Sequence, residues 1–296
     1  MKDINGGRGC TWSRGKIFTS FIMFHLALLL LALSCYTLAD AKVLLEDKFT
    51  PTYCSCFFYK GTEPTGIIPP DGARICQRFA NKYRFATVYD RKRRIPTYSA
   101  YIYEAKMSVR TKWMIEPQLV SQSYSETMEL ERSTKIPKKL LRESQAVDED
   151  YKSASKTYDR GHINPSLHHN DGFDSKATFT LTNVVPQNRI LNQGAWKKYE
   201  EDTIRNRAEG CSRTYAIVGA IPGNNAIANR VNIPGYLWAA ACCTMANHTV
   251  RAWAVIAENS NKNKVDPITI QSLEAQISQS TGGSVRLFHD DCPRNV

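Results

Sequence analysis

The sequence has no internal repeat and no long low-complexity tract, and none of its nine cysteines stand in a Cys-x-x-Cys spacing. The first two absences leave no reason to divide the chain into several folded units. The third argues against a metal site built from paired cysteines. What is present, 296 residues of which 42% are hydrophobic, suffices for one substantial core, so we predict a single domain over residues 42–296.

Residues 1–41 have the pattern of an export signal. Four basic residues precede an apolar run from Ile17 to Leu33, and small residues that suit signal peptidase follow at 37–41. The pattern predicts a secreted, extracellular protein that has no stable association with membranes once the signal is cleaved. The alternative is an uncleaved membrane anchor, because the apolar run is close to the shortest length that spans a bilayer.

Beyond this leader the cysteines are at positions 54, 56, 76, 211, 242, 243 and 292. An exported chain meets an oxidising compartment, so we expect disulfides, whose pairing the sequence leaves open. Because seven is an odd number, at least one cysteine is expected to be free or to pair between chains. Asn247 opens the triplet Asn-His-Thr and is predicted to carry an N-linked glycan at the tip of a hairpin.

The net charge is +11 for the whole chain and +9 without residues 1–41. Such an excess of Lys and Arg favours polyanions as partners, through long-range attraction and the release of counterions. The alternative is a solvated basic surface without a polyanionic partner.

Strand-like patterns dominate the domain, and two pairs of them are expected to form hairpins, one with a basic turn at residues 91–94 and one around Asn247. Residues 107–156 read as a long polar excursion on the surface. Strand pairs with few helices indicate an α+β fold. The expected strands are 85–90, 95–104, 214–219, 236–245, 249–258 and 285–288, and the expected helices are 138–143, 192–207 and 269–278.

His162 is the first candidate for catalysis. Its imidazole has an ordinary pKa of about 6.5, so it is largely neutral near physiological pH and can accept a proton from water. Gly161 permits a close approach of the backbone, and Asp159 and Arg160 can fix the surrounding loop. For a single histidine after a turn, a structural role is the alternative.

A second group of candidates lies further along the chain. If Asn192 opens the helix over 192–207, then Asn192, Trp196 and Glu200 follow at four-residue steps on one side of it. The amide oxygen of Asn192 is a hard, neutral ligand that suits Mg²⁺, with Mn²⁺ as an alternative, and Glu200 can hold a metal-bound water. The competing interpretation makes Asn192 a helix cap, Trp196 a core residue and Glu200 a solvated charge.

The stretch that contains these residues resembles the signature of the DNA/RNA non-specific endonuclease family, and the similarity extends over about residues 85–258. The resemblance implies an α+β fold of the ββα-metal type around a central antiparallel sheet. Departures at 163–166 and before Asp159 bear on substrate preference. The matching segments are Asp159-Arg160-Gly161-His162, Leu181-Thr182-Asn183 with Pro186-Gln187, and Leu191-Asn192-Gln193-Gly194-Ala195-Trp196 followed by Glu200.

The same resemblance implies roles for single residues. His162 is expected to be the general base, Asn192 the direct ligand of Mg²⁺, Glu200 a holder of metal-bound water and Asn183 a site-supporting residue. The family also places an arginine on an upstream strand, and Arg94 is the predicted match.

We therefore predict a secreted, Mg²⁺-dependent endonuclease that hydrolyses DNA and RNA with little sequence preference, because contacts to the phosphate backbone carry no direct sequence code. One alternative is an extracellular protein that binds polyanions with weak or no catalysis. Another is a phosphodiesterase for small nucleotides. The preferred polymer and the oligomeric state stay open.

Overall fold

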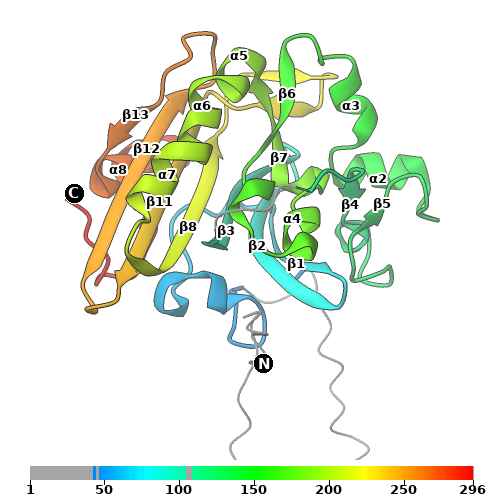
Figure 1. Cartoon of the computed structure of the whole chain (residues 1–296). Coiled ribbons are helices and arrows are strands. Elements are labelled where there is room, and N and C mark those ends of the chain that lie inside the picture. Colours follow the sequence, from blue (N-terminus) through cyan, green and yellow to red (C-terminus); the bar gives the residue numbers. More distant parts are fainter. Residues whose placement is uncertain (1–42, 45–46, 105–108, 296) are drawn as a thin grey trace, which may run out of the picture.

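The computed structural model describes residues 43–44, 47–104 and 109–295. Within them a seven-stranded sheet, ordered β1-β2-β3-β8-β11-β12-β13, runs through the centre of the molecule, and every neighbouring pair is antiparallel (Figure 1). The predicted α+β fold with a central antiparallel sheet is confirmed. The predicted leader over 1–41 lies outside the described residues. In the part that is described, no helix has the length and apolar character needed to cross a bilayer.

The strands of the central sheet are β1 (Gly72–Phe79), β2 (Lys82–Asp90), β3 (Ile95–Tyr103), β8 (Cys211–Ile221), β11 (Tyr236–Met245), β12 (Val250–Glu258) and β13 (Asp266–Ile268). Three antiparallel ribbons accompany it: β4 (Met114–Ile115) with β5 (Glu129–Leu130), β6 (Tyr158–His162) with β7 (Val184–Asn188), and β9 (Asn225–Ile227) with β10 (Val231–Ile233). The helices are α2 (Lys138–Ser144), α3 (Asp148–Lys152), α4 (Gly172–Ala177), α5 (Arg189–Gln193), α6 (Ala195–Lys198), α7 (Ile204–Arg207) and α8 (Ile270–Thr281).

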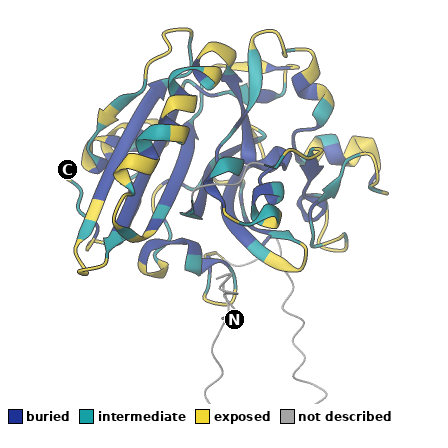
Figure 2. Cartoon of the chain, in the orientation of Figure 1, coloured by how far each residue is buried: buried dark blue, intermediate teal, exposed yellow. Residues whose placement is uncertain are grey.

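Both faces of the sheet are buried, as Figure 2 shows for the central strands. Along β11, Leu237 and Ala239 face one hydrophobic core whereas Trp238 and Ala240 face the other, as the two-residue period of a strand requires. The first core also contains the buried residues of β7 and α5 to α7, and the second those of α8 and the N-terminal segment. The sheet therefore separates two layers, and the β6–β7 ribbon belongs to the first.

Disulfides fasten both layers to the sheet. The adjacent residues Cys242 and Cys243 belong to opposite cores, so each bonds to a different part of the chain. Cys56 is also disulfide-bonded, so none of the seven cysteines is free. The expectation that the odd cysteine pairs between chains stays a prediction. The bonds within the described chain are Cys54–Cys76, Cys211–Cys243 and Cys242–Cys292.

The two predicted hairpins are confirmed, but the predicted helix over 192–207 is wrong in its start and its regularity. Helix α5 begins earlier, where the side chain of Asn188 accepts a hydrogen bond from the Ile190 N–H (3.0 Å). It stops at Gly194 (φ −111°, ψ −110°), beside the side chain of the distant Asn263. The chain then continues through α6, a π-helical turn, η6 (Tyr199–Thr203), and α7.

Two further expectations need correction. The region 107–156 is not a surface excursion, because it contributes β4, β5, α2 and α3 and buries Ile115 and Tyr151 in the first core. The predicted helix at 138–143 is confirmed as part of α2. No strand forms at 285–288, since the Leu287 N–H donates to the Glu274 carboxylate (2.8 Å) instead of to a neighbouring strand.

Candidate functional site

The β6–β7 ribbon and helix α5 form a ββα unit on one face of the central sheet (Figure 1). His162 ends β6 and pairs with Val184, the first residue of β7. Because α5 follows β7 directly, Asn192 in α5 lies beside the β6–β7 ribbon, where it contacts Asp159 of β6. Glu200 lies beyond it, in the π-helical turn η6. The ββα unit and the turn that follows it thus carry the predicted base, metal ligand and carboxylate.

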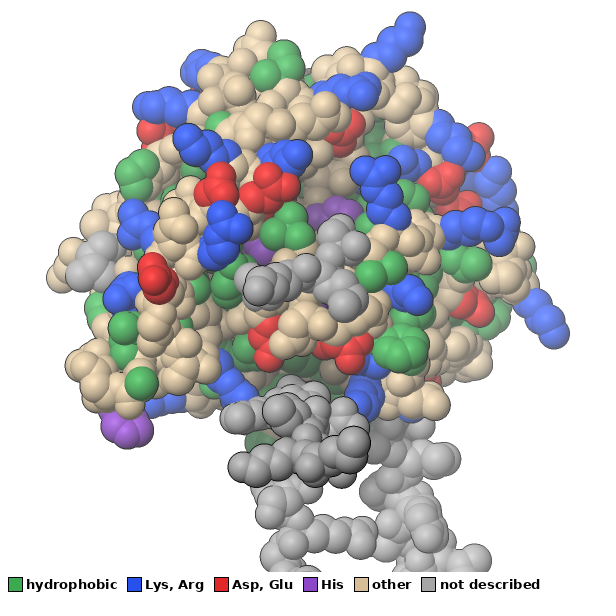
Figure 3. Space-filling view, in the orientation of Figure 1, with side chains coloured by type: hydrophobic (Ala, Val, Ile, Leu, Met, Phe, Trp, Pro, Cys, Tyr) green, Lys and Arg blue, Asp and Glu red, His purple; other side chains and the backbone are tan. Residues whose placement is uncertain are grey.

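The ring of His162 packs against two aromatic side chains, Trp113 and Phe179, which also contact each other (5.1 Å between ring centroids). Its centroid is 5.3 Å from that of Trp113 and 4.9 Å from that of Phe179. Burial lowers the pKa of His162 to about 4, so the imidazole is neutral at physiological pH. Its Nε2 atom is buried and makes no hydrogen bond within the described chain. Figure 3 shows histidine surface in a hollow near the middle of this face, with Lys and Arg side chains around it.

The backbone that follows His162 is held by Asn183. Its carbonyl oxygen accepts the Ile163 N–H (2.9 Å), and its side-chain Oδ1 accepts the Asn164 N–H (3.0 Å). The side-chain Nδ2 donates to the carbonyl oxygens of Asn164 and Thr178 (both 2.9 Å). The buried Asn183 therefore uses its whole amide to fix the turn that orients His162.

Gly161 is required by a close cross-strand approach. A Cβ atom at this position would lie 2.1 Å from Oε1 and 2.4 Å from Cβ of Gln187. These separations are too short for any side chain larger than hydrogen. Gly161 therefore lets β6 and β7 pack closely directly before His162.

Asp159 orients the amide of Asn192. Its Oδ2 atom accepts hydrogen bonds from Nδ2 of Asn192 (3.0 Å) and from Nε2 of Gln193 (2.8 Å). Because the amide nitrogen of Asn192 is engaged in this way, its oxygen points elsewhere and remains available as a ligand. Asn192 is partly exposed, so a solvated ion can reach it.

Glu200 is tied to the segment after β6 through its backbone. Its carbonyl oxygen accepts a hydrogen bond from Nε2 of His168 (2.9 Å), which leaves Nδ1 of that ring to accept the Tyr101 hydroxyl (2.9 Å). Burial raises the pKa of the Glu200 carboxyl to about 8, and the nearby indole N–H of Trp196 offsets part of this rise without completing a hydrogen bond. Near neutral pH the carboxyl is therefore largely protonated unless a cation is bound.

Arg160 points to the opposite side of the ribbon from Asp159. Its guanidinium donates to the Asp148 carboxylate (2.6 Å) and lies over the rings of Trp113 (5.6 Å) and Tyr151 (5.3 Å). Trp113 thus contacts both Arg160 and His162. Arg160 holds in place the tryptophan that covers the imidazole.

The structure does not bring Arg94 to this site. Arg94 precedes β3, whereas the residue after β3, Glu104, donates its N–H to the His168 carbonyl (2.9 Å). The nine residues of β3 span about 30 Å at the rise of an extended strand. Arg94 therefore lies at the far end of the strand from His168 and Glu200.

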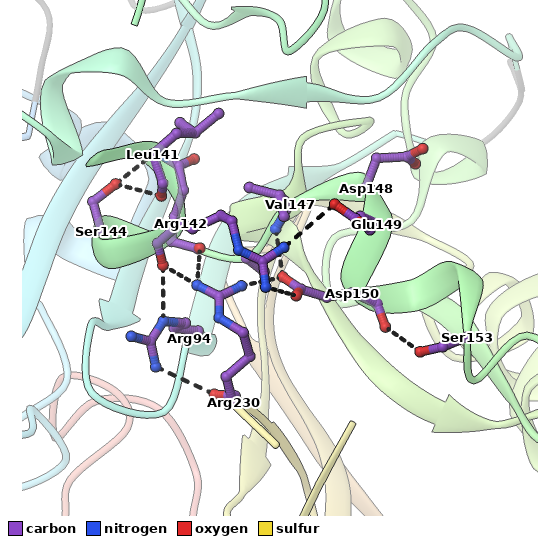
Figure 4. Close-up of polar contacts among 12 residues, drawn as sticks. Arg94, Leu141, Arg142, Ser144, Val147, Asp148, Glu149, Asp150, Ser153 and Arg230 are labelled. Carbon is purple, nitrogen blue, oxygen red and sulfur yellow. Dashed lines mark hydrogen bonds and ion pairs between the residues drawn. The ribbon is translucent and has the colours of Figure 1, made fainter. Parts of the chain in front are cut away.

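Figure 4 shows what Arg94 does instead. Its side chain donates to the carbonyl oxygens of Arg142 (3.3 Å) and Arg230 (3.4 Å). Asp150, which is buried, forms an ion pair with Arg230 in the same cluster. Burial and the charge of Arg230 lower the pKa of Arg94. These contacts join the β2–β3 turn to the end of α2, so Arg94 supports the structure of that region.

The donor set fits an ion that retains most of its water. No group of three or more His, Cys, Asp or Glu side chains capable of holding a metal occurs in the described residues. The oriented, neutral oxygen of Asn192 and the carboxyl of Glu200 offer few protein ligands, as Mg²⁺ accepts when substrate and water complete its octahedron. Transition metals that require several nitrogen or sulfur ligands fit this site poorly.

Two residues that contact the candidate site residues were missed in the sequence. Trp113 lies in a polar stretch far from the recognised motifs, and only its position before the apolar pair Met114-Ile115 indicates burial. His168 follows the motif closely and could have been considered with His162.

Asn247, the predicted glycosylation site, is exposed between β11 and β12, and its side chain accepts a hydrogen bond from the Thr249 hydroxyl (2.7 Å).

The chain is similar in sequence to known proteins. Residues 66–294 match the model of the DNA/RNA non-specific endonuclease family. The chain is 31% identical to the Endonuclease domain-containing 1 protein of Mus musculus over 263 residues, which are 86% of this chain and 50% of the mouse protein. It is 26% identical to the Homo sapiens protein of the same name over 265 residues, again 86% of this chain and 50% of the relative.

The chain spans about half the length of these two relatives. Among solved structures, it is similar to one described as a crystal structure of the EndoG/EndoGI complex, with 20% identity and a TM-score of 0.48. That match covers 68% of this chain and 82% of the other.

Proposed function

Since the chain belongs to the DNA/RNA non-specific endonuclease family, we propose that it is a secreted, Mg²⁺-dependent endonuclease that hydrolyses phosphodiester bonds of DNA and RNA. The observation that carries this proposal is the ββα unit. In it, His162 ends strand β6, is neutral, and has an Nε2 atom that makes no hydrogen bond within the described chain. On the same strand, Asp159 orients the amide of Asn192. An imidazole and a hydrated cation near one phosphate supply the requirements of diester hydrolysis.

In this mechanism His162 accepts a proton from the attacking water. The aromatic rings of Trp113 and Phe179 keep the imidazole neutral and fix its plane, and Asn183 fixes the backbone that follows it. Asn192 would hold Mg²⁺ directly, and Glu200 would hold a water bound to it. A cation there supplies charge relief to the phosphate and stabilises the leaving oxygen.

Positive charge for the phosphate comes from the loop that precedes Trp113. Arg110 is exposed, lies three residues before Trp113 and takes part in no ion pair within the described chain. Three residues of extended chain reach at most about 11 Å, which is comparable to the length of an arginine side chain plus a phosphate. We therefore assign the phosphate contact to Arg110 in place of Arg94.

Export is the second part of the proposal. It rests on the leader pattern of residues 1–41, on the disulfides of the described chain and on the exposed Asn247. Disulfides of this number are typical of oxidising compartments. Sequencing the N-terminus of protein collected from culture medium tests export and cleavage of the leader. A loss of mass on glycosidase treatment of the wild type, absent in Asn247→Gln, tests the use of Asn247.

The alternative is a binding protein that retains the fold and the basic surface without turnover. Incubation of plasmid and of RNA with the purified protein, in Mg²⁺ or in chelator, separates the two. The proposal requires fragmentation in Mg²⁺ and intact polymer in chelator. A shifted but intact polymer under both conditions would establish the binding protein instead.

A further inference from the structure

A pocket of about 810 Å³ adjoins the site on the side of Trp113. It lies between the residues that precede β4, those that follow β5, and helices α2 and α3, which gather on the right of Figure 1. Its apolar lining consists of Trp113, Leu130, Ile136 and Leu141. The volume is within the range of about 300–1,000 Å³ that is usual for organic ligands.

The pocket and the proposed active site share one side chain, that of Trp113. Trp113 lines the pocket and also contacts the ring of His162 at 5.3 Å. Asp148 lines it as well and holds Arg160, whose guanidinium lies over the ring of Trp113 (5.6 Å). A ligand in the pocket is therefore separated from His162 by one side chain.

The charged side chains at the rim of the pocket differ in whether they form ion pairs within the protein. Two of the rim carboxylates form ion pairs: Asp148 binds Arg160 (2.6 Å) and Lys152 (3.1 Å), and Glu149 binds Lys138 (2.8 Å). The third, Glu131, accepts the Asp148 N–H (2.8 Å) and forms no ion pair with a described residue. Lys112 and Arg132 are exposed and likewise form no ion pair with any described residue. The rim thus presents two unpaired cations and one unpaired carboxylate above an apolar floor.

We propose that this pocket binds one unstacked nucleotide of a single-stranded nucleic acid, next to the phosphate that is cleaved. The apolar floor takes the base and sugar, and Lys112 and Arg132 take phosphates of the same strand. A base inside a duplex is stacked between its neighbours and does not enter a recessed pocket, so the site favours single strands. The inference rests on the proposed function and specifies its substrate.

The test measures binding without cleavage. Fluorescence anisotropy in chelator gives the affinity of the wild-type protein for a labelled 12-nucleotide single strand, for the same strand with abasic sites, and for the corresponding duplex. We expect abasic sites to weaken binding by about 5- to 150-fold, as the loss of one bound base does elsewhere, and the duplex to bind more weakly than the single strand.

Two variants and a matched control locate the effect. Lys112→Ala and Arg132→Ala should each weaken single-strand binding and reduce the dependence of log Kd on log salt by about 0.7. Lys139→Ala removes an exposed lysine of α2 that does not line the pocket, and should leave both quantities unchanged. Equal affinity for normal and abasic strands, or equal effects of all three variants, would overturn the proposal.

Turnover separates this inference from the proposed function. With Mg²⁺, the KM for the single strand should rise for Lys112→Ala and Arg132→Ala, whereas Lys139→Ala should cleave both the single strand and a small nitrophenyl ester of a mononucleotide at the wild-type rate. If the wild-type protein binds the single strand as expected but cleaves no substrate, the proposed function fails and the pocket stands. If it cleaves normally while the rim variants behave as Lys139→Ala does, the pocket assignment fails.

Discussion

Replacing Asp159 by alanine should weaken the binding of Mg²⁺ although Asp159 is not expected to touch the ion. Its carboxylate holds Nδ2 of Asn192 at 3.0 Å, and this hydrogen bond decides which end of the amide faces the site. Without it, the amide rotates freely and its NH₂ group competes with the oxygen for the ligand position. A residue that orients a ligand in this way typically contributes a factor of about 10–100 to metal affinity.

The free energy of the Asp159–Asn192 hydrogen bond gives the same range for the loss of Mg²⁺ affinity. A hydrogen bond to a charged group contributes about 1.5–3 kcal/mol, and each 1.4 kcal/mol is a factor of ten in an equilibrium constant, so its loss corresponds to about 10- to 100-fold. Asp159→Asn retains an acceptor oxygen without the charge and should lie between the wild type and Asp159→Ala. The order of the three proteins is therefore a stronger test than either substitution alone.

The assay is the Mg²⁺ concentration that gives half-maximal cleavage of a single-stranded oligonucleotide, measured together with calorimetric titration of the ion in the presence of a non-cleavable substrate. Gln193→Ala is the matched control, because Gln193 binds the same oxygen (2.8 Å) but offers no ligand to the ion. Half-saturation that is unchanged in Asp159→Ala would refute the assignment of Asn192 as the metal ligand. So would an equal change in Gln193→Ala.

Three further predictions concern pH, phosphate contact and packing. Burial lowers the pKa of His162 to about 4 and raises that of Glu200 to about 8. At saturating Mg²⁺ the cleavage rate should therefore persist well below pH 6.5. The Mg²⁺ concentration for half-maximal activity should rise as the pH falls below 8, because the ion must then displace a proton from Glu200. A cleavage rate that falls with a midpoint at pH 6.5, together with a half-saturating concentration that does not depend on pH, would contradict both assignments. Arg110→Ala should lower kcat by more than tenfold and Arg94→Ala should chiefly lower the melting temperature, as steady-state kinetics and thermal unfolding can show; the reverse result would restore Arg94 to the site. Gly161→Ala should destabilise the protein by about 1–3 kcal/mol through overlap with Gln187, and an unchanged melting temperature would mean that the ribbon relaxes at no cost.

The sequence predicts correctly those elements of the fold whose residue patterns are local. The β2–β3 and β11–β12 hairpins follow from alternating apolar residues and short turns. The asparagine-rich loop around Asn263 shows the limit of this approach. The side chain of Asn263 accepts a hydrogen bond from the Ala195 N–H (2.7 Å) across a separation of 68 residues. This contact interrupts the helix that the sequence predicts to be continuous over 192–207. No local signal at Gly194 specifies that partner.

The candidate site divides in the same way. The residues on β6 and α5 come from a compact motif, and the structure places Asp159 and Asn192 in direct contact. Trp113 could not be assigned, because its contact with His162 joins segments 49 positions apart in a region that reads as polar. Arg94 was misplaced for a related reason: a basic turn next to a motif strand says which strand the residue borders, but not which end of that strand faces the site.

The most direct test of the central claim is digestion of plasmid and RNA by the purified protein and by His162→Ala, each in Mg²⁺ and in chelator. Removal of a general base typically costs about 100- to 10,000-fold in rate. The account predicts Mg²⁺-dependent fragmentation by the wild type, a loss of that size in His162→Ala, and unchanged affinity for a single strand in chelator. Wild-type turnover by the folded His162→Ala protein would contradict it.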